Sequence, residues 1–129
     1  MSYEIVHDNA RLWVTRDGAL LGGYAANKLR AYAFPFFSPN GALVLQEAPP
    51  DHPHHQGIWA GLDVDGHDLW NAGSFDVPRN RQELVVPLRE IETACSETGA
   101  RLTHEVRWVS VDGADLLRER REVVFRAAP

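Results

Sequence analysis

Short runs of alternating apolar and polar residues recur along this chain, and they predict strands rather than helices. Near the N-terminus, residues 3–6 and 11–15 show this alternation. Turn-forming pairs, Asp8-Asn9 and Asp17-Gly18, follow each run. The beginning of the chain is therefore expected to form a meander of short antiparallel strands.

The middle of the chain contains strand-like segments that are interrupted by glycine and proline. Residues 29–37 and 42–46 are the apolar segments. The interruptions are Gly22-Gly23, Pro35, Pro39 and Asn40-Gly41. Further prolines at positions 49, 50 and 53 exclude residues 49–55 from a helix or a central strand, and this stretch is expected to be an extended loop.

Residues 82–92 alternate in part and are rich in β-branched side chains, which predicts a strand. Pro87 lies in this run and indicates an edge position or a bulge, because proline cannot donate to a strand ladder. A helix over residues 84–97 would place Pro87 in its interior at a cost of about 3 kcal/mol. We therefore expect a strand here.

The clearest local signal lies near the C-terminus, where residues 100–111 and 115–126 flank Asp112-Gly113. This dipeptide suits the positive φ angles of a tight hairpin turn. One face of the first strand carries Leu102, His104, Val106 and Trp108. These patterns predict one domain over residues 1–129, an all-β antiparallel β-sandwich with few or no helices.

Composition narrows the functional classes. No apolar run approaches the ~20 residues that cross a bilayer, so we expect no membrane association. The N-terminus lacks signal-peptide features and Cys95 is the only cysteine, which predicts a reducing, cytoplasmic setting. The net charge is −5 and the basic residues form no stripe, so nucleic acid is not an expected partner.

Histidines are concentrated in the proline-rich loop, at His52, His54 and His55, and His67 follows. Residues two apart in an extended chain face the same side, so His52 and His54 are expected to converge. With His67 or Asp65 they would suit a divalent metal such as Zn²⁺ or Fe²⁺. They would equally hydrogen-bond a polar ligand, or cap turns within the loop.

Aromatic and amide side chains surround this cluster. A pyranose has an apolar C–H face and a rim of hydroxyl groups, which match an aromatic ring with polar neighbours. Trp59 and Trp70 are candidates for stacking on the ring, and Trp70, beside Asn71, is the stronger one; core filling is the alternative role for either. Gln56 is a candidate for binding ligand hydroxyls.

Charged residues offer further candidates. Glu47 and Asp51 flank the first prolines and would serve as acid and base if their environments separated their pKa values; alternatively they are solvated loop charges. Arg79 would bind a carboxylate or phosphate, or form a surface salt bridge.

Residues 45–59 and 64–70, with residues 32–39 upstream, resemble a bacterial family labelled PmoA-type methane oxygenase, also catalogued as a domain of unknown function. The matching motif is Asp-His-Pro-His-His-Gln-Gly-Ile-Trp at residues 51–59. Asp65 stands where the family often has asparagine. The resemblance covers about the first half of the family domain. The oxygenase label names a subunit built from membrane-spanning helices, which this chain does not contain, so the label does not predict the chemistry.

The resemblance implies a galactose-mutarotase-like β-sandwich with the histidine loop at a sugar cleft. A small-molecule carbohydrate is then the expected ligand, with no cofactor required. If the protein is an enzyme, His52, His54, His55 or His67 would act as acid and Glu47, Asp51 or Asp65 as base. One alternative is a metalloprotein, an oxygenase or hydrolase, that uses His52, His54 and His67. The other is a non-catalytic half-domain remnant that pairs through exposed sheet edges as a homo-oligomer.

Overall fold

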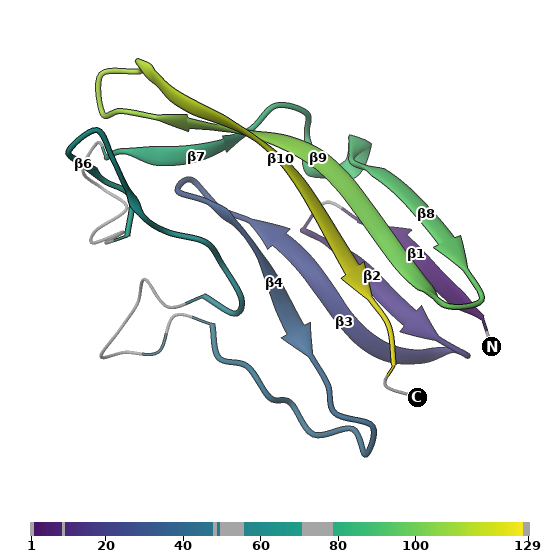
Figure 1. Ribbon diagram of the computed structural model, residues 1–129. Coiled ribbons are helices and arrows are strands. Elements are labelled where there is room, and N and C mark those ends of the chain that lie inside the picture. The colour runs from purple at the N-terminus through teal and green to yellow at the C-terminus, as the bar shows by residue number, and fades with distance from the viewer. Residues whose placement is uncertain (1, 9, 48, 50–55, 71–78, 128–129) are drawn as a thin grey trace.

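Four antiparallel strands from the first part of the chain form one sheet (Figure 1). The computed structural model describes residues 2–8, 10–47, 49, 56–70 and 79–127. The strands lie in the order β1-β2-β3-β4. Their bounds are Tyr3–His7 for β1, Arg11–Arg16 for β2, Ala19–Ala26 for β3 and Ala31–Phe36 for β4. The meander expected near the N-terminus is thereby confirmed.

A second antiparallel sheet comes from the C-terminal part of the chain. Its central strand is β9, which pairs with β10 on one side and with β7 and β8 on the other. The bounds are Arg81–Leu84 for β7, Glu92–Ser96 for β8, Gly99–Val109 for β9 and Asp115–Phe125 for β10. The predicted hairpin is confirmed, and Gly113 has the positive φ, +86°, that its turn requires.

Two smaller elements complete the described fold. A two-stranded hairpin consists of β5 (Asp63–Val64) and β6 (His67–Asp68). A short 3-10 helix, η1, spans Leu88–Glu90. No helix among the described residues is long and apolar enough to cross a membrane.

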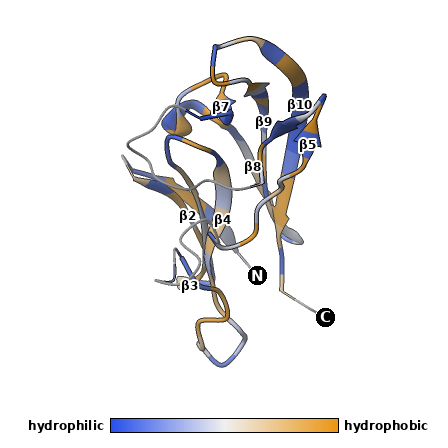
Figure 2. Cartoon of the chain, turned by 90° about the vertical axis from the view of Figure 1, so that its left-hand side faces the viewer, coloured by the Kyte–Doolittle hydropathy of each residue, from blue (hydrophilic) through white to orange (hydrophobic). Residues whose placement is uncertain are grey.

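The two sheets pack face to face, as the edge-on view of Figure 2 shows, and the core lies between them. The alternating pattern causes this arrangement, because every second side chain of a strand faces inward. Leu12 and Val14 of the first sheet and Leu102 of the second are completely buried. Complete burial of a side chain of this size contributes about 1.5–3 kcal/mol. The prediction of an all-β antiparallel sandwich is confirmed.

Two of the predicted strands are wrong. Residues 82–92 do not form one strand, since β7 ends at Leu84 and Pro87 precedes η1. The fixed φ of Pro87, −55°, suits the start of a helical turn, and its carbonyl accepts from Glu90 N at 2.9 Å. Residues 42–46 form no strand either; Leu43 pairs with Phe37 only as an isolated bridge.

The Gly22-Gly23 pair does not interrupt a strand but lies within β3. A Cβ atom on Gly23 would lie 2.8 Å from the Phe34 carbonyl oxygen, and one on Gly22 would lie 2.9 Å from the Phe125 ring. Glycine therefore permits close approach between neighbouring parts of the sandwich rather than a turn.

We expect Leu102→Ala to lower the free energy of unfolding by about 2–5 kcal/mol, because it removes methyl and methylene groups from the hydrophobic core between the sheets. Leu20→Ala is the matched control, since Leu20 is 41% exposed, and its effect should stay within about 0.5 kcal/mol. Urea denaturation followed by circular dichroism measures both. Equal effects would contradict the assignment of Leu102 to the core.

Candidate functional site

The proline-rich loop that carries the histidine motif is closed at its base by the bridge between Glu47 and Gln56. Gly57 N donates to Gln46 O at 2.8 Å, and Ile58 then pairs with Ala33 of β4 through bonds of 2.9 and 3.0 Å. Four candidates lie in this loop but outside the described residues: Asp51, His52, His54 and His55.

Gly57 explains one position of the motif. Its φ is +60°, and a Cβ atom there would lie 2.0 Å from the carbonyl oxygen of Ala33. Only glycine allows the chain to leave the loop and pair at once with the edge of β4. The local sequence thus attaches the histidine loop to the first sheet.

Glu47 is held by two side chains from the first sheet. Arg11 Nη2 donates to its carboxylate oxygens at 2.7 and 3.0 Å, and the Tyr32 hydroxyl donates to Oε2 at 2.8 Å. Arg11 and Tyr32 belong to strands on either side of β3, and both are in register with Ala25. Burial, followed by the hydrogen bond to Glu47 and its negative charge, raises the pKa of Tyr32 to about 12.

These contacts limit the role that Glu47 can take as a catalytic base. Both carboxylate oxygens already accept hydrogen bonds, and the guanidinium of Arg11 balances the charge. A base that must receive a proton from a ligand needs a free lone pair directed at it. The geometry therefore favours Glu47 as the anchor of the loop, and its catalytic role stays a prediction.

Trp59 and Trp70 meet although eleven positions separate them in the sequence. Their ring centroids lie 4.7 Å apart at an interplanar angle of 47°. The guanidinium carbon of Arg30 lies 3.9 Å from the centroid of the Trp59 ring, and Arg30 Nη2 donates to the Trp70 carbonyl at 3.2 Å. Burial lowers the pKa of Arg30 to about 10, so it remains a cation at neutral pH.

The two tryptophans differ in accessibility. A Cβ atom on Gly61 would lie 2.2 Å from the Trp59 ring, so that half-buried ring packs closely against Gly61 and Arg30. Trp70 is 48% exposed, and its backbone N–H is fixed by Asp68 Oδ1 at 2.8 Å. Trp70 therefore presents an aromatic surface to solvent, and Trp59 supports it.

The remaining candidates have local roles that the structure makes visible. Asp65, with φ +49°, and Gly66, with φ +79°, form the turn between β5 and β6. Asparagine and aspartate both tolerate this conformation, which accounts for either residue at position 65. His67 is half-buried opposite Val64, and the β5–β6 hairpin lies at the side of the sandwich (Figure 1).

Among the described residues, no group of three or more His, Cys, Asp or Glu side chains is placed to hold a metal ion. The metal ligands expected with His67, namely His52 and His54, belong to the undescribed loop. Metal binding thus stays a prediction.

The remaining ligand candidates lie in different places. Gln56 is buried, and Arg79 lies just before β7 with its carbonyl near Arg81. Asn71 is outside the described residues.

A buried polar network between the sheets was not predicted. Arg121 of β10 is its centre, and all five of its N–H groups have acceptors. Nε donates to Glu119 at 2.8 Å, Nη1 to the Tyr24 hydroxyl at 3.0 Å and the Ala31 carbonyl at 3.1 Å, and Nη2 to Gln82 at 3.1 Å and Glu119 at 2.9 Å. Because no N–H is left over, Arg121 is unsuited to binding an anionic ligand.

His104 extends this network. Its Nε2 lies 2.7 Å from the Tyr24 hydroxyl. Burial, with a contribution from the positive charge of Arg121, lowers the pKa of His104 to about 4, so the ring is neutral at neutral pH. Tyr24 accepts from Arg121, and the bond between its hydroxyl and Nε2 forms with either group as donor, depending on the tautomer of His104. The signal in the sequence was the histidine on the apolar face of β9.

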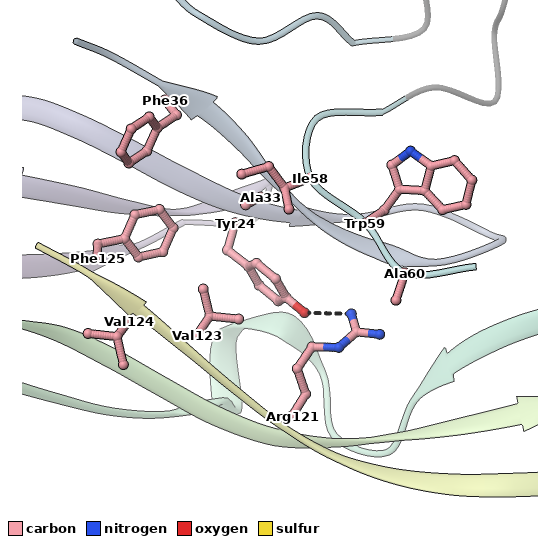
Figure 3. Close-up of a pocket in the computed structure, with 10 residues that line it drawn as sticks. All are labelled: Tyr24, Ala33, Phe36, Ile58, Trp59, Ala60, Arg121, Val123, Val124 and Phe125. Atoms are coloured by element: carbon pink, nitrogen blue, oxygen red, sulfur yellow. Dashed lines mark hydrogen bonds between the residues drawn. The ribbon is translucent and has the colours of Figure 1, made fainter. Parts of the chain in front are cut away.

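A partly open cavity of about 440 Å³ lies beside this network, between the two sheets (Figure 3). Tyr24 and Arg121 form its polar part. The other lining residues are mainly apolar: Ala33, Phe36, Ile58, Trp59, Ala60, Val123, Val124 and Phe125. Trp59 connects the cavity with the exposed Trp70 ring. The cavity suits the apolar surface of an uncharged ligand.

We expect Glu47→Ala to lower the free energy of unfolding by about 1–3 kcal/mol, because Arg11 and Tyr32 would lose their acceptor in a partly buried place. Glu122→Ala is the control, since its pair with Arg101 is 3.8 Å long and exposed, and it should cost about 0.5 kcal/mol or less. Chemical denaturation compares the two variants, and a negligible cost at position 47 would contradict the anchoring role.

Acidification should destabilise the protein through His104. The unfolded chain binds a proton at this side chain near pH 6.5, whereas the folded protein does so only near pH 4. Stability from the neutral ring is therefore complete above pH 6.5 and is lost as the pH falls towards 4, by about 1–3 kcal/mol. His104→Gln should flatten the unfolding free energy over this range, while His7→Gln, at an exposed position, should not.

Comparison with known proteins adds a family. A family model described as a family of unknown function (DUF6807) matches residues 11–129. The match includes both sheets except β1, and it includes the histidine loop and both tryptophans. No curated protein and no solved structure matches the chain significantly.

Proposed function

The chain belongs to this family of unknown function, DUF6807, and we propose that it binds a small carbohydrate at the surface formed by Trp59, Trp70 and the histidine loop. The observation that carries the proposal is the half-exposed Trp70 ring supported by Trp59 and Arg30. A rigid exposed indole suits the apolar C–H face of a sugar ring. A related galactose-mutarotase-like architecture is part of this proposal.

The polar contacts in the proposal come from the neighbouring loop. Gln56 closes that loop and is followed after two residues by Trp59, so the chain connects the histidine motif directly to the aromatic pair. Neutral imidazoles donate and accept hydrogen bonds, which suits the hydroxyl rim of a sugar. His52, His54, His55 and His67 are proposed to make these contacts.

The charge distribution favours a neutral sugar over an anionic one. Arg121, the cation that lines the cavity, has acceptors for all of its N–H groups, and Glu119 balances its charge. Arg30 is engaged with Trp59 and the Trp70 carbonyl. An added carboxylate would have to displace these contacts, so uncharged mono- or oligosaccharides are the proposed class.

Proton transfer at the bound sugar is a further element of this proposal. A loop histidine would act as acid, and the three hydrogen bonds that Glu47 already accepts favour Asp51 over Glu47 as the base. The metalloprotein alternative has no described contact in its favour and stays a prediction. Elemental analysis of the purified protein distinguishes it, because about one metal ion per chain would support it.

Trp70→Ala should weaken binding of a neutral saccharide by at least about tenfold, because the stacking surface is removed. Trp70→Phe keeps an aromatic face and should stay within about threefold of the parent. Val111→Ala is the control at another exposed apolar position, and it should not change affinity. Calorimetric titration against a panel of neutral saccharides measures this. Unchanged affinity in Trp70→Ala, or no binding by any member of the panel, would overturn the proposal.

A further inference from the structure

Strand β10 is a long sheet edge. Among the residues that the structure describes, it pairs only with β9, and the ladder is regular from Leu117 to Phe125 after a bulge near Asp115. Figure 1 shows β10 as the outer strand of its sheet. The backbone groups on its other side can pair with another strand, and such edges are normally protected by charge or by a partner.

The sequence of this edge is complementary to itself. Residues 117–123 read Leu-Arg-Glu-Arg-Arg-Glu-Val. If a second copy of β10 runs antiparallel with Arg120 opposite its own equivalent, Arg118 faces Glu122 and Leu117 faces Val123. Glu119 lies opposite Arg121, and both keep the hydrogen bonds that they make within their own chain. Each pair occurs twice because of the twofold symmetry. Opposite charges and apolar side chains are the pairings that stabilise neighbouring strands.

Other registers lack this property. A twofold axis perpendicular to the sheet keeps the inner faces of both copies on one side, so it must pass through a residue pair. Centring it on Glu119 would oppose Arg118 with Arg120. Centring it on Arg121 would oppose Arg118 with Val124 and Glu119 with Val123. Only the register centred on Arg120 places opposite charges or two apolar residues opposite each other at all pairs from 117 to 123, apart from Arg120 itself.

We propose that two copies of this chain associate through β10 in this register, forming one continuous sheet across the twofold axis. The charges on the outer face, Arg118 and Glu122, pair with Glu105 and Arg101 of β9, but they are 60% and 52% exposed and therefore remain accessible to a second copy. Arg120 on the axis meets its equivalent, which opposes the association; Glu105, opposite Arg120 on β9, bonds Arg118 and keeps negative charge beside the axis.

The association would also border the cavity. Val123 and Val124 of β10 line the cavity, and Leu117 of the second copy would lie opposite Val123. The apolar surface of this edge would thus be covered by apolar residues of the second copy. This inference rests on the strand edge alone, and it does not depend on saccharide binding.

Paired charge reversals test the register directly. Arg118→Glu places a glutamate opposite Glu122 of the second copy, and Glu122→Arg places an arginine opposite Arg118. Each variant alone should dimerise at least about tenfold more weakly than the parent chain. Mixed in equal amounts they form complementary pairs at both positions, and the mixture should regain an affinity within about threefold of the parent.

Sedimentation equilibrium of the parent chain, the two variants and their mixture gives the dissociation constants, and far-UV circular dichroism confirms that each variant folds. Arg89→Glu, which reverses a charge on η1 away from the edge, should leave dimerisation unchanged. A parent chain that stays monomeric at millimolar concentration would overturn the proposal. So would dimerisation that is insensitive to Arg118→Glu, or variants whose mixture is as weak as either alone.

Discussion

The guanidinium of Arg121 is the constraint on which the arrangement of the two sheets depends. It projects from β10 and donates to Tyr24 of β3, to the Ala31 carbonyl of β4 and to Gln82 of β7. Burial opposes its charge, yet the bonds to Glu119 and Tyr24 raise its pKa, so it is charged at any ordinary pH. A buried cation with one acceptor missing is strongly destabilising, and the sheets are therefore restricted to the alignment that supplies all five.

The polar neighbours of Arg121 extend this restriction towards the cavity. Burial alone would raise the pKa of the Glu119 carboxyl, but the bonds from Arg121 and from Trp108 Nε1, the latter 2.9 Å long, outweigh burial and lower it. Gln82 Nε2 donates to the Ala60 carbonyl at 2.6 Å, which links the network to the segment that carries Trp59. The position of the aromatic pair is thus connected to the interior through backbone and amide contacts, not through packing alone.

The same residues separate structural from ligand-facing roles. Charged groups that looked available in the sequence, such as Glu47, already accept hydrogen bonds from other side chains of the fold. Trp70, by contrast, has nearly half of its surface exposed, and that surface is open to a ligand. A ligand site on this domain is therefore expected to use aromatic surface and neutral hydrogen-bonding groups, since the buried charges serve to align the sheets.

Local residue patterns were sufficient for the fold class, for the strands at the N-terminus and for the C-terminal hairpin, because strand alternation and the Asp112-Gly113 turn act over neighbouring residues. They failed at Gly22-Gly23 and Pro87, where the reason for the residue is a contact or a cap outside its own segment. The meeting of Arg121 with Tyr24, 97 positions away, and of Trp59 with Trp70 was decided only by tertiary structure. No local pattern encodes which inward side chains meet across a sandwich, because that depends on how the two sheets are aligned.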